Sequence, residues 1–285
     1  MLARKEDGNM KAVGITACSN GLKPETRENN QGLIRFLQTE GRKVLVSPCI
    51  YGQANGFSGT GEARAEALMS MFENPEIQDI YDISGGDMAN EVLDYLDFSR
   101  IRESSAEFWG YSDLTVVMNA IYAKTGKTSV LYQIRNLLDQ EWGEVQRRRY
   151  LNGKELFTPA VQMARGNSME GILIGGNIRC FLKLAGTAYF PDPQGKILLL
   201  EARSGRVPQM VTYLSQLRSM GVFSKIRGIL LGTFCEMERE KCAPDILSLT
   251  EQFVGRNMPI ARTAEIGHRA DSKAIRIGEY IKITR

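Results

Sequence analysis

The chain of 285 residues is poor in the side chains from which metal sites and disulfide frameworks are built. It contains a single histidine and an odd number of cysteines, with no Cys-x-x-Cys pair among Cys18, Cys49, Cys180, Cys235 and Cys242. Zinc sites need clustered cysteine and histidine ligands, and disulfide frameworks need cysteines in pairs. The sequence therefore argues against both kinds of site and favours a reducing compartment.

Long apolar runs and a charge imbalance are also missing. No segment approaches the roughly 20 apolar residues that a membrane helix needs. Residues 1–10, MLARKEDGNM, are polar and charged with no apolar segment behind them, so no secretory signal is expected. The 36 Lys and Arg residues nearly balance the 33 Asp and Glu residues, and a net charge of +3 is too small for a dedicated nucleic-acid-binding protein. We expect a cytoplasmic protein that binds neither nucleic acid nor membrane.

The first half of the chain alternates short apolar runs with helical patterns. The predicted strands are KAVGITAC (11–18), KVLVSPC (43–49), IQDIYDISGG (77–86) and EFWGY (107–111). The first predicted helix begins near Pro24, and three more cover 62–72, 89–96 and 113–126. Strands and helices that alternate in short units predict an α/β fold, with a mostly parallel sheet and helices on both faces. In such a sheet, ligands bind at the carboxyl ends of the strands.

Apolar periodicity fades between about Val130 and Asn167, where charged residues become more frequent. We therefore predict an N-terminal α/β domain over 1–135, a connector over 136–166 and a second, smaller α/β domain over 167–285. The predicted strands of the second domain are GILIGG (171–176), KILLLEA (196–202), RGILLGTF (227–234) and YIKIT (280–284), with a helix over 207–221.

Ser112 lies in FWGYSDLT, where a buried strand should turn abruptly into a helix. That geometry is typical of a nucleophile elbow, which exposes a hydroxyl beside the unpaired amide groups at the start of the helix. The usual G-x-S-x-G pattern is incomplete, because Leu114 stands where the second glycine belongs. On this motif alone, a helix N-cap is the commoner role for such a serine.

A nucleophilic serine needs a base, and the only histidine is His268. Glu201 ends the apolar strand KILLLE, where its carboxylate can orient an imidazole. Both residues also have ordinary interpretations, as a surface or core histidine and as a strand-end glutamate. The order serine, glutamate, histidine on strand-end loops matches a known order of catalytic triads.

Two adjacent glycines in SGGDM (84–88) close the strand that precedes the Ser112 strand. Glycine lets a backbone amide approach a substrate closely, so the amides of Gly86 and Asp113 are candidates for an oxyanion hole. A simple turn is the commoner interpretation of two adjacent glycines.

In combination, these residues resemble the LD-carboxypeptidases, a family that includes the muramoyltetrapeptide carboxypeptidases and the microcin C immunity peptidases. The resemblance runs from SGGDM through GYSD and NAIYAKTG, and it resumes at GGN, AGT, KILLLE and EIGH. It implies a two-domain serine peptidase with Ser112 as nucleophile, His268 as base and Glu201 as the partner that orients the base. The backbone amides of Gly86 and Asp113 would donate to the oxyanion.

The resemblance also implies a reaction and its requirements. The family works without metal or organic cofactor and usually as a homodimer, and its LD-carboxypeptidase members remove the terminal D-alanine from murein tetrapeptides in the cytoplasm. Asn177, in the matching Gly-Gly-Asn, would contact the small peptide substrate. The residue that reads the free carboxylate of the substrate is left open among Arg64, Arg203 and Arg206.

Two segments depart from the family pattern close to where a substrate would lie. Asp87 and Met88 follow the glycine pair in place of a Gly-Tyr-Gly-like sequence, and SVLYQIRNLL (129–138) replaces a Gly-Pro segment. Two alternatives therefore stay open beside the murein peptidase. One is an immunity-type serine hydrolase that acts on a microcin C-like aminoacyl nucleotide analogue, and the other is a non-catalytic binding protein of the same fold.

Overall fold

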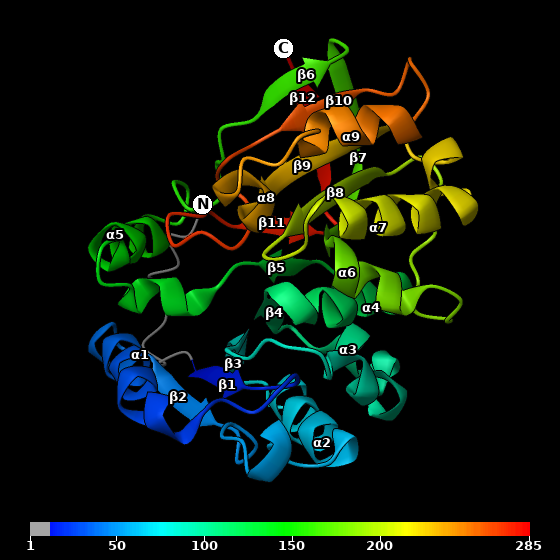
Figure 1. Ribbon diagram of the computed structural model, residues 1–285. Coiled ribbons are helices and arrows are strands. Elements are labelled where there is room, and N and C mark those ends of the chain that lie inside the picture. Colours follow the sequence, from blue (N-terminus) through cyan, green and yellow to red (C-terminus); the bar gives the residue numbers. More distant parts are fainter. Residues whose placement is uncertain (1–11) are drawn as a thin grey trace.

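The computed structural model describes residues 12–285, which form two sheets flanked by helices (Figure 1). The expectation about a secretory signal in residues 1–10 concerns a segment outside this range. Both sheets are mostly parallel, so the predicted α/β class is confirmed. Within residues 12–285, none of the helices combines the length and the apolar character needed to cross a membrane.

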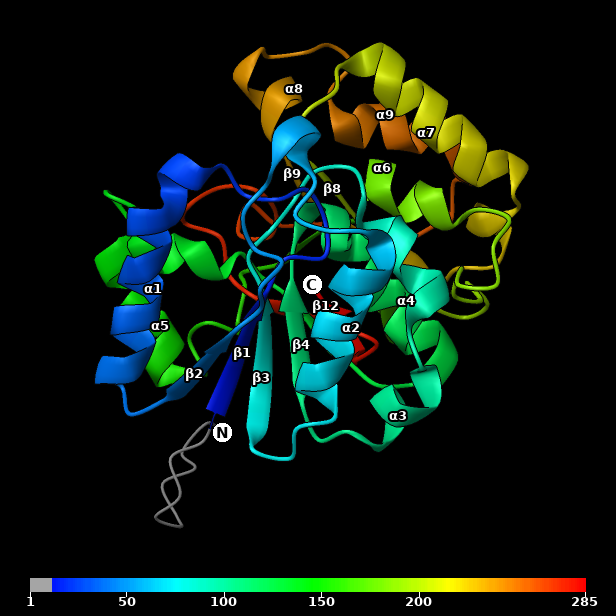
Figure 2. The same ribbon diagram turned by 90° about the horizontal axis from the view of Figure 1, so that it is seen from below.

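The first sheet is built from β1 (Ala12–Thr16), β2 (Lys43–Val46), β3 (Ile77–Asp82), β4 (Glu107–Gly110), β5 (Ser129–Leu131) and β11 (Ile275–Ile277). Their order across the sheet is β11-β5-β4-β3-β1-β2, and only β11 is antiparallel to its neighbour. One face is covered by α1 (Arg27–Thr39) and α5 (Gly143–Asn152), and the other by α2 (Gly61–Phe72), α3 (Phe98–Glu103) and α4 (Thr115–Thr125) (Figure 2). Because helices cover both faces, every residue of β1 is buried.

The second sheet is built from β6 (Gln162–Arg165), β7 (Ser168–Asn177), β8 (Ile197–Ala202), β9 (Gly228–Phe234), β10 (Ile260–Arg262) and β12 (Tyr280–Thr284). Four parallel strands, β7-β8-β9-β10, form its centre, and β12 and β6 are antiparallel edges. Leu198 and Leu200 pack in the core beneath α7 (Val207–Ser219) and α9 (Ile246–Phe253), whereas Ile197 and Leu199 belong to a core shared with the first sheet. This two-residue alternation shows that β8 is buried on both faces.

Helix α4, which begins just after Ser112, contacts both sheets. Its side chains Val117, Met118 and Ile121 lie in the same apolar cluster as Leu173 of β7. The Asn119 amide group donates to the carbonyl of Gly175 at 2.9 Å and accepts from the Gly175 amide at 2.9 Å. The helix that follows the serine is therefore fixed directly to the second sheet, which contains Glu201 in β8.

The structure differs from the sequence prediction in a few short elements. The predicted helix over 89–96 is a 3-10 helix over Ala89–Tyr95, and its buried residues are Ala89, Val92 and Leu93. Strands β5, β10 and β11 were not predicted, since three residues are too few to show an alternating pattern. The domain boundaries after 135 and 166 stay a prediction, and β11 adds a C-terminal segment to the edge of the first sheet.

Candidate active site

Ser112 lies in a tight turn between β4 and α4. The strand ends at Gly110, a 3-10 turn covers Ser112–Leu114, and α4 begins at Thr115. The turn places Ser112 at φ +53°, in the left-handed region that costs a non-glycine residue about 1–2 kcal/mol. A side chain at Gly110 would lie 2.7 Å from Leu114 Cβ, so the sharp turn requires glycine there.

Ser112 does not occupy a helix N-cap position. The residues that precede the two helical segments are Tyr111 and Leu114, and neither makes a side-chain capping hydrogen bond. The serine instead lies inside the turn, in a strained backbone conformation. Strain of this kind persists only where the surrounding structure enforces it, and it is concentrated at functional sites.

Glu201 and His268 form a buried pair. Nδ1 of His268 lies 2.6 Å from Oε2 of Glu201, and the two side chains are 6% and 1% exposed. Glu201 is the second-last residue of β8, and His268 lies in the loop that follows β10. Among the described residues, the other ring nitrogen of His268, Nε2, has no hydrogen-bond partner. An imidazole held by a carboxylate at one nitrogen and free at the other can serve as a general base.

A single small pocket contains all three predicted triad residues. It is lined by Tyr111, Ser112, Leu131, Tyr132, Gln133, Glu201, Gly267, His268, Ser272 and Lys273. Its enclosed volume is about 10 Å³, room for roughly one water molecule. The ring of Tyr111 lies 5.6 Å from the ring of His268, centre to centre, so the residue before the serine contacts the imidazole. The structure thus brings together side chains from the turn after β4, from β8 and from the loop after β10.

The glycine pair after β3 lies beside the serine. A Cβ built on Gly85 would be 3.8 Å from Ser112 Cβ, and one built on Gly86 would be 2.3 Å from the Asn20 side chain. Gly86 also has φ +140°, which L side chains rarely adopt. Among the described residues, no hydrogen bond engages the Gly86 amide. Its N–H is therefore available to an oxygen placed next to Ser112.

Asp82 anchors the start of this turn. One carboxylate oxygen accepts hydrogen bonds from the Ser84 amide at 2.8 Å and the Ser84 hydroxyl at 2.6 Å, and the other accepts from the Cys18 amide at 2.7 Å. Burial raises the pKa of the Asp82 carboxyl, and the hydrogen bonds from Ser84 and Cys18 oppose that rise. The carboxyl is therefore a structural acceptor for the glycine turn.

Two cationic side chains of the second domain hold the glycine turn from the other side. Arg179 donates to the Gly86 carbonyl at 2.9 Å and forms an ion pair with Asp87. Lys183 donates to the Asp87 carbonyl at 2.8 Å and forms an ion pair with Asp113. Both candidate oxyanion donors, at residues 86 and 113, are thus fixed by contacts from α6 (Ile178–Phe181) and the turn after it.

The side chain of Asp113 has a role that the sequence did not indicate. Its carboxylate is fully buried, and it accepts hydrogen bonds from the Ser19 hydroxyl at 2.7 Å and the Ala89 amide at 2.8 Å. Lys183, from the second domain, is the third partner of the Asp113 carboxylate. Asp113 therefore connects the two domains at the residue that follows Ser112. Contacts between residues so far apart in the chain leave no spacing pattern, so no sequence signal could have identified Ser19 or Lys183.

We expect Lys183→Met to slow the reaction and destabilise the protein. It leaves the Asp113 carboxylate buried without its cation, at a cost of about 3 kcal/mol. The two turns that carry the candidate donors, one at Gly86 and one at Asp113, also lose a shared contact, so kcat should fall about 10- to 100-fold with little change in KM. The measurements are thermal unfolding and steady-state kinetics below the unfolding range.

Two further variants test this explanation. Lys183→Arg keeps the charge and should restore part of kcat. Lys282→Met removes one half of an exposed ion pair with Glu170, in which the side chains are 64% and 46% exposed, and should change stability by less than about 0.5 kcal/mol. A Lys183→Met enzyme with wild-type kcat would show that the ion pair does not position the turn.

The predicted substrate contact Asn177 ends β7 and is 5% exposed. Its side-chain oxygen caps α6 by accepting from the Cys180 amide at 3.3 Å, and its own amide donates to the Thr115 hydroxyl at 3.0 Å. These contacts fix the end of β7 against the start of α4. A contact between Asn177 and substrate stays a prediction.

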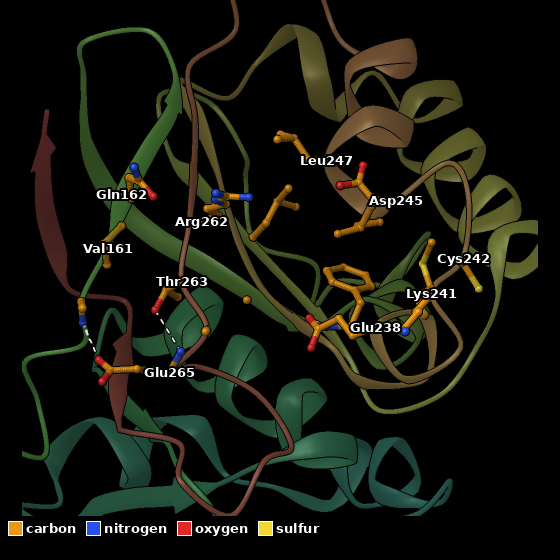
Figure 3. A pocket seen from close by; sticks show the side chains of 17 residues that line it. Val161, Gln162, Glu238, Lys241, Cys242, Asp245, Leu247, Arg262, Thr263 and Glu265 are labelled. Atoms are coloured by element: carbon orange, nitrogen blue, oxygen red, sulfur yellow. Dashed lines mark hydrogen bonds between the residues drawn. The ribbon is translucent and has the colours of Figure 1, made fainter.

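A much larger cavity than the one around Ser112 lies apart from these residues, in the second domain (Figure 3). Its volume is about 660 Å³, and its walls come from the ends of β9 and β10, from α8 (Cys235–Arg239) and from the segment that leads into α9. Glu265 and Thr263, on one wall, belong to the loop that continues to His268. None of the three triad candidates lines this cavity, and no group of His, Cys, Asp or Glu in residues 12–285 is arranged to hold a metal ion.

Comparison with known proteins agrees with this two-domain arrangement. The chain matches the LD-carboxypeptidase N-terminal domain over residues 13–132 and the LD-carboxypeptidase C-terminal domain over residues 170–283. It is 26% identical over 279 residues to a probable murein peptide carboxypeptidase of Bacillus subtilis, covering 93% of this chain and 86% of the relative. It is also 26% identical over 293 residues to the microcin C7 self-immunity protein MccF of Escherichia coli, covering 88% and 83%.

A solved structure shows the same fold. An MccF-like protein from Bacillus anthracis superposes with a TM-score of 0.84 at 23% sequence identity, over 98% of this chain and 94% of that chain. The two domain matches together cover most of residues 13–283. The chain belongs to the LD-carboxypeptidase family.

Proposed function

We propose that this protein is a serine carboxypeptidase that hydrolyses an L,D-amide bond and releases a terminal D-alanine from murein tetrapeptide-type substrates. The nucleophile is Ser112, the general base is His268, and Glu201 orients the base. The observation that carries the proposal is the buried Glu201–His268 pair, whose free Nε2 shares a pocket with a serine in a strained turn. Such an arrangement is typical of hydroxyl activation by a neighbouring imidazole.

The proposed reaction uses these groups in two stages, acylation of Ser112 and hydrolysis of the acyl-enzyme. Nε2 of His268 accepts the proton of the Ser112 hydroxyl while the serine oxygen attacks the scissile carbonyl carbon. The amides of Gly86 and Asp113 donate to the carbonyl oxygen as it becomes negative. His268 then protonates the leaving amine, and an acyl-enzyme remains. A water molecule then attacks the ester carbonyl carbon and gives its proton to His268, and His268 returns that proton to the Ser112 oxygen as the ester bond breaks. Throughout, Glu201 holds the tautomer and stabilises the imidazolium.

The substrate class is supported by the names of two relatives. Members that are similar over most of their length include a probable murein peptide carboxypeptidase and a murein tetrapeptide carboxypeptidase of Pseudomonas aeruginosa. The second candidate is an immunity-type hydrolase for an aminoacyl nucleotide analogue, because MccF is similar to the same degree. A solved structure of MccF holds aspartyl sulfamoyl adenosine, a compound of that class. A non-catalytic binding protein is the third candidate.

Release of D-alanine from purified murein tetrapeptide tests the proposal, with Ser112→Ala as the blank. Release by the wild type that vanishes in the variant supports the carboxypeptidase. Hydrolysis of aspartyl sulfamoyl adenosine alone would favour the immunity-type enzyme. Labelling of Ser112 by a fluorophosphonate separates both enzymes from a binding protein, because the probe reports an activated serine irrespective of substrate.

A cytoplasmic location and a homodimer complete the proposal, together with a reaction that needs no metal or organic cofactor. They rest on the family resemblance. Light scattering coupled to size-exclusion chromatography tests the dimer, and full activity after dialysis against a chelator tests the independence from metal.

A further inference from the structure

Most cationic side chains around the candidate site are paired with carboxylates. Ion pairs join Arg179 to Asp87, Lys183 to Asp113 and Lys273 to Glu265. A cation that already has a carboxylate partner offers little to an anionic ligand, because binding would have to break the existing pair.

Arg135 is different. It lies in a 3-10 helix, Ile134–Leu138, directly after the carboxyl end of β5. Its terminal nitrogen Nη2 donates to the neutral hydroxyl of Tyr111 at 3.1 Å. Its Nε is buried and has no hydrogen-bond partner, and it forms no ion pair with any carboxylate among residues 12–285. A partly buried guanidinium with an unmet donor is a ready anion site.

Tyr111 links this guanidinium to the reacting groups. The tyrosine directly precedes Ser112, and its ring lies 5.6 Å from that of His268. Its hydroxyl is 3.3 Å from the position that a Cβ on Gly85 would take, so it lies against the glycine turn. Arg135 is therefore one side chain away from the nucleophile, the base and the candidate oxyanion hole.

The proposed reaction releases an amino acid with a free carboxylate, so an anion-binding group is expected near the reacting groups. When a single amino acid is released, its free carboxylate is separated from the scissile nitrogen by one carbon atom. The group that binds this carboxylate must therefore lie near the reacting groups, at the distance of a side chain that contacts them through a neighbour. A guanidinium can bind both carboxylate oxygens at once, which selects a free acid over an amide or ester.

The arginines considered from the sequence fit this role less well. Arg64 is completely buried, forms an ion pair with Glu91 and donates to the Cys18 carbonyl. Arg206 pairs with carboxylates on α8 and beside it. Arg203 is exposed, and no contact connects its side chain to the serine or the histidine.

We propose that Arg135, together with the hydroxyl of Tyr111, binds the free terminal carboxylate of the substrate. This inference rests on the proposed carboxypeptidase function. It assigns a specificity role to the segment 129–138, which contains Arg135.

The test compares murein tetrapeptide with the same peptide carrying a C-terminal carboxamide. We expect the wild type to prefer the free acid by about 10- to 100-fold in kcat/KM, as for a charge-assisted hydrogen bond. In Arg135→Met, kcat/KM for the acid should fall to the level of the amide, and the value for the amide should stay within about twofold. Arg135→Lys should retain part of the preference. Arg203→Met removes an exposed charge from the end of β8 and should retain all of it.

Fluorophosphonate labelling of Ser112 in the same samples distinguishes a failure of the proposed triad from a failure of the proposed carboxylate site at Arg135. Wild-type protein that is not labelled contradicts the proposed triad. Labelled wild type without preference for the acid, or Arg135→Met with an undiminished preference, contradicts the Arg135 subsite and leaves the triad intact. If Arg203→Met loses the preference for the free acid and Arg135→Met keeps it, Arg203 binds the substrate carboxylate.

Discussion

Ser112→Gly is expected to abolish turnover and to make the protein more stable. Removal of the proposed nucleophile should lower kcat by at least about 10³-fold, and by as much as about 10⁶-fold if the proposed triad acts as a unit. The backbone of Ser112 has φ +53°, a region in which glycine is unstrained and other residues are not. Relief of that strain should add about 1 kcal/mol to the free energy of unfolding, or about 2 °C in Tm for a chain of this size.

Ser112→Ala is the matched control for this prediction. Alanine removes the same hydroxyl and keeps the strain, so it should be equally inactive, with stability within about 1 kcal/mol of the wild type. D-alanine release and differential scanning calorimetry on the three proteins measure both effects. A glycine variant with wild-type activity would remove the serine from the mechanism. A glycine variant less stable than the alanine variant would mean that the turn carries no strain.

Two of the three triad candidates could be predicted because each lies at the end of a recognisable element. Ser112 follows an apolar strand and precedes a helical pattern, and Glu201 closes a strongly apolar run. The carboxyl ends of parallel strands are where α/β proteins place their ligands, so position in the pattern was informative even without the fold. His268 follows no regular element and was identified because the chain has no other histidine.

The residues that support the site could not be predicted in this way. Arg179 reaches Asp87 across 92 positions of sequence, and Lys183 reaches the same residue across 96. Such pairs depend on how α6 packs against the first domain, which no local periodicity encodes. Arg135 was missed for a related reason, because β5 has three residues and gave no strand pattern to mark its carboxyl end.

Glu201→Gln should lower kcat by about 10⁴-fold while the protein stays folded. In the proposed mechanism, the carboxylate oxygen that lies 2.6 Å from Nδ1 of His268 accepts a hydrogen bond from a protonated Nδ1, so that Nε2 accepts the proton of Ser112. A glutamine amide has the same shape and can donate its NH₂ group to Nδ1. This contact favours the tautomer with the proton on Nε2, and Nε2 can then no longer accept the proton of Ser112. The amide also cannot stabilise the imidazolium that forms when the serine attacks. Steady-state D-alanine release measures the loss.

The effect of losing the Glu201 charge can be separated from a loss of stability through disrupted packing. Glu201 is 1% exposed, so a change of shape there would destabilise the protein, whereas glutamine has nearly the same volume. Glu170→Gln, in an exposed ion pair with Lys282, is the control for removal of one negative charge and should retain full activity. If Glu201→Gln keeps more than about a tenth of the wild-type kcat, the glutamate only fills space beside His268, and the base must be oriented by another group. If kcat falls and Tm does not, the charge of Glu201 acts on the reaction itself.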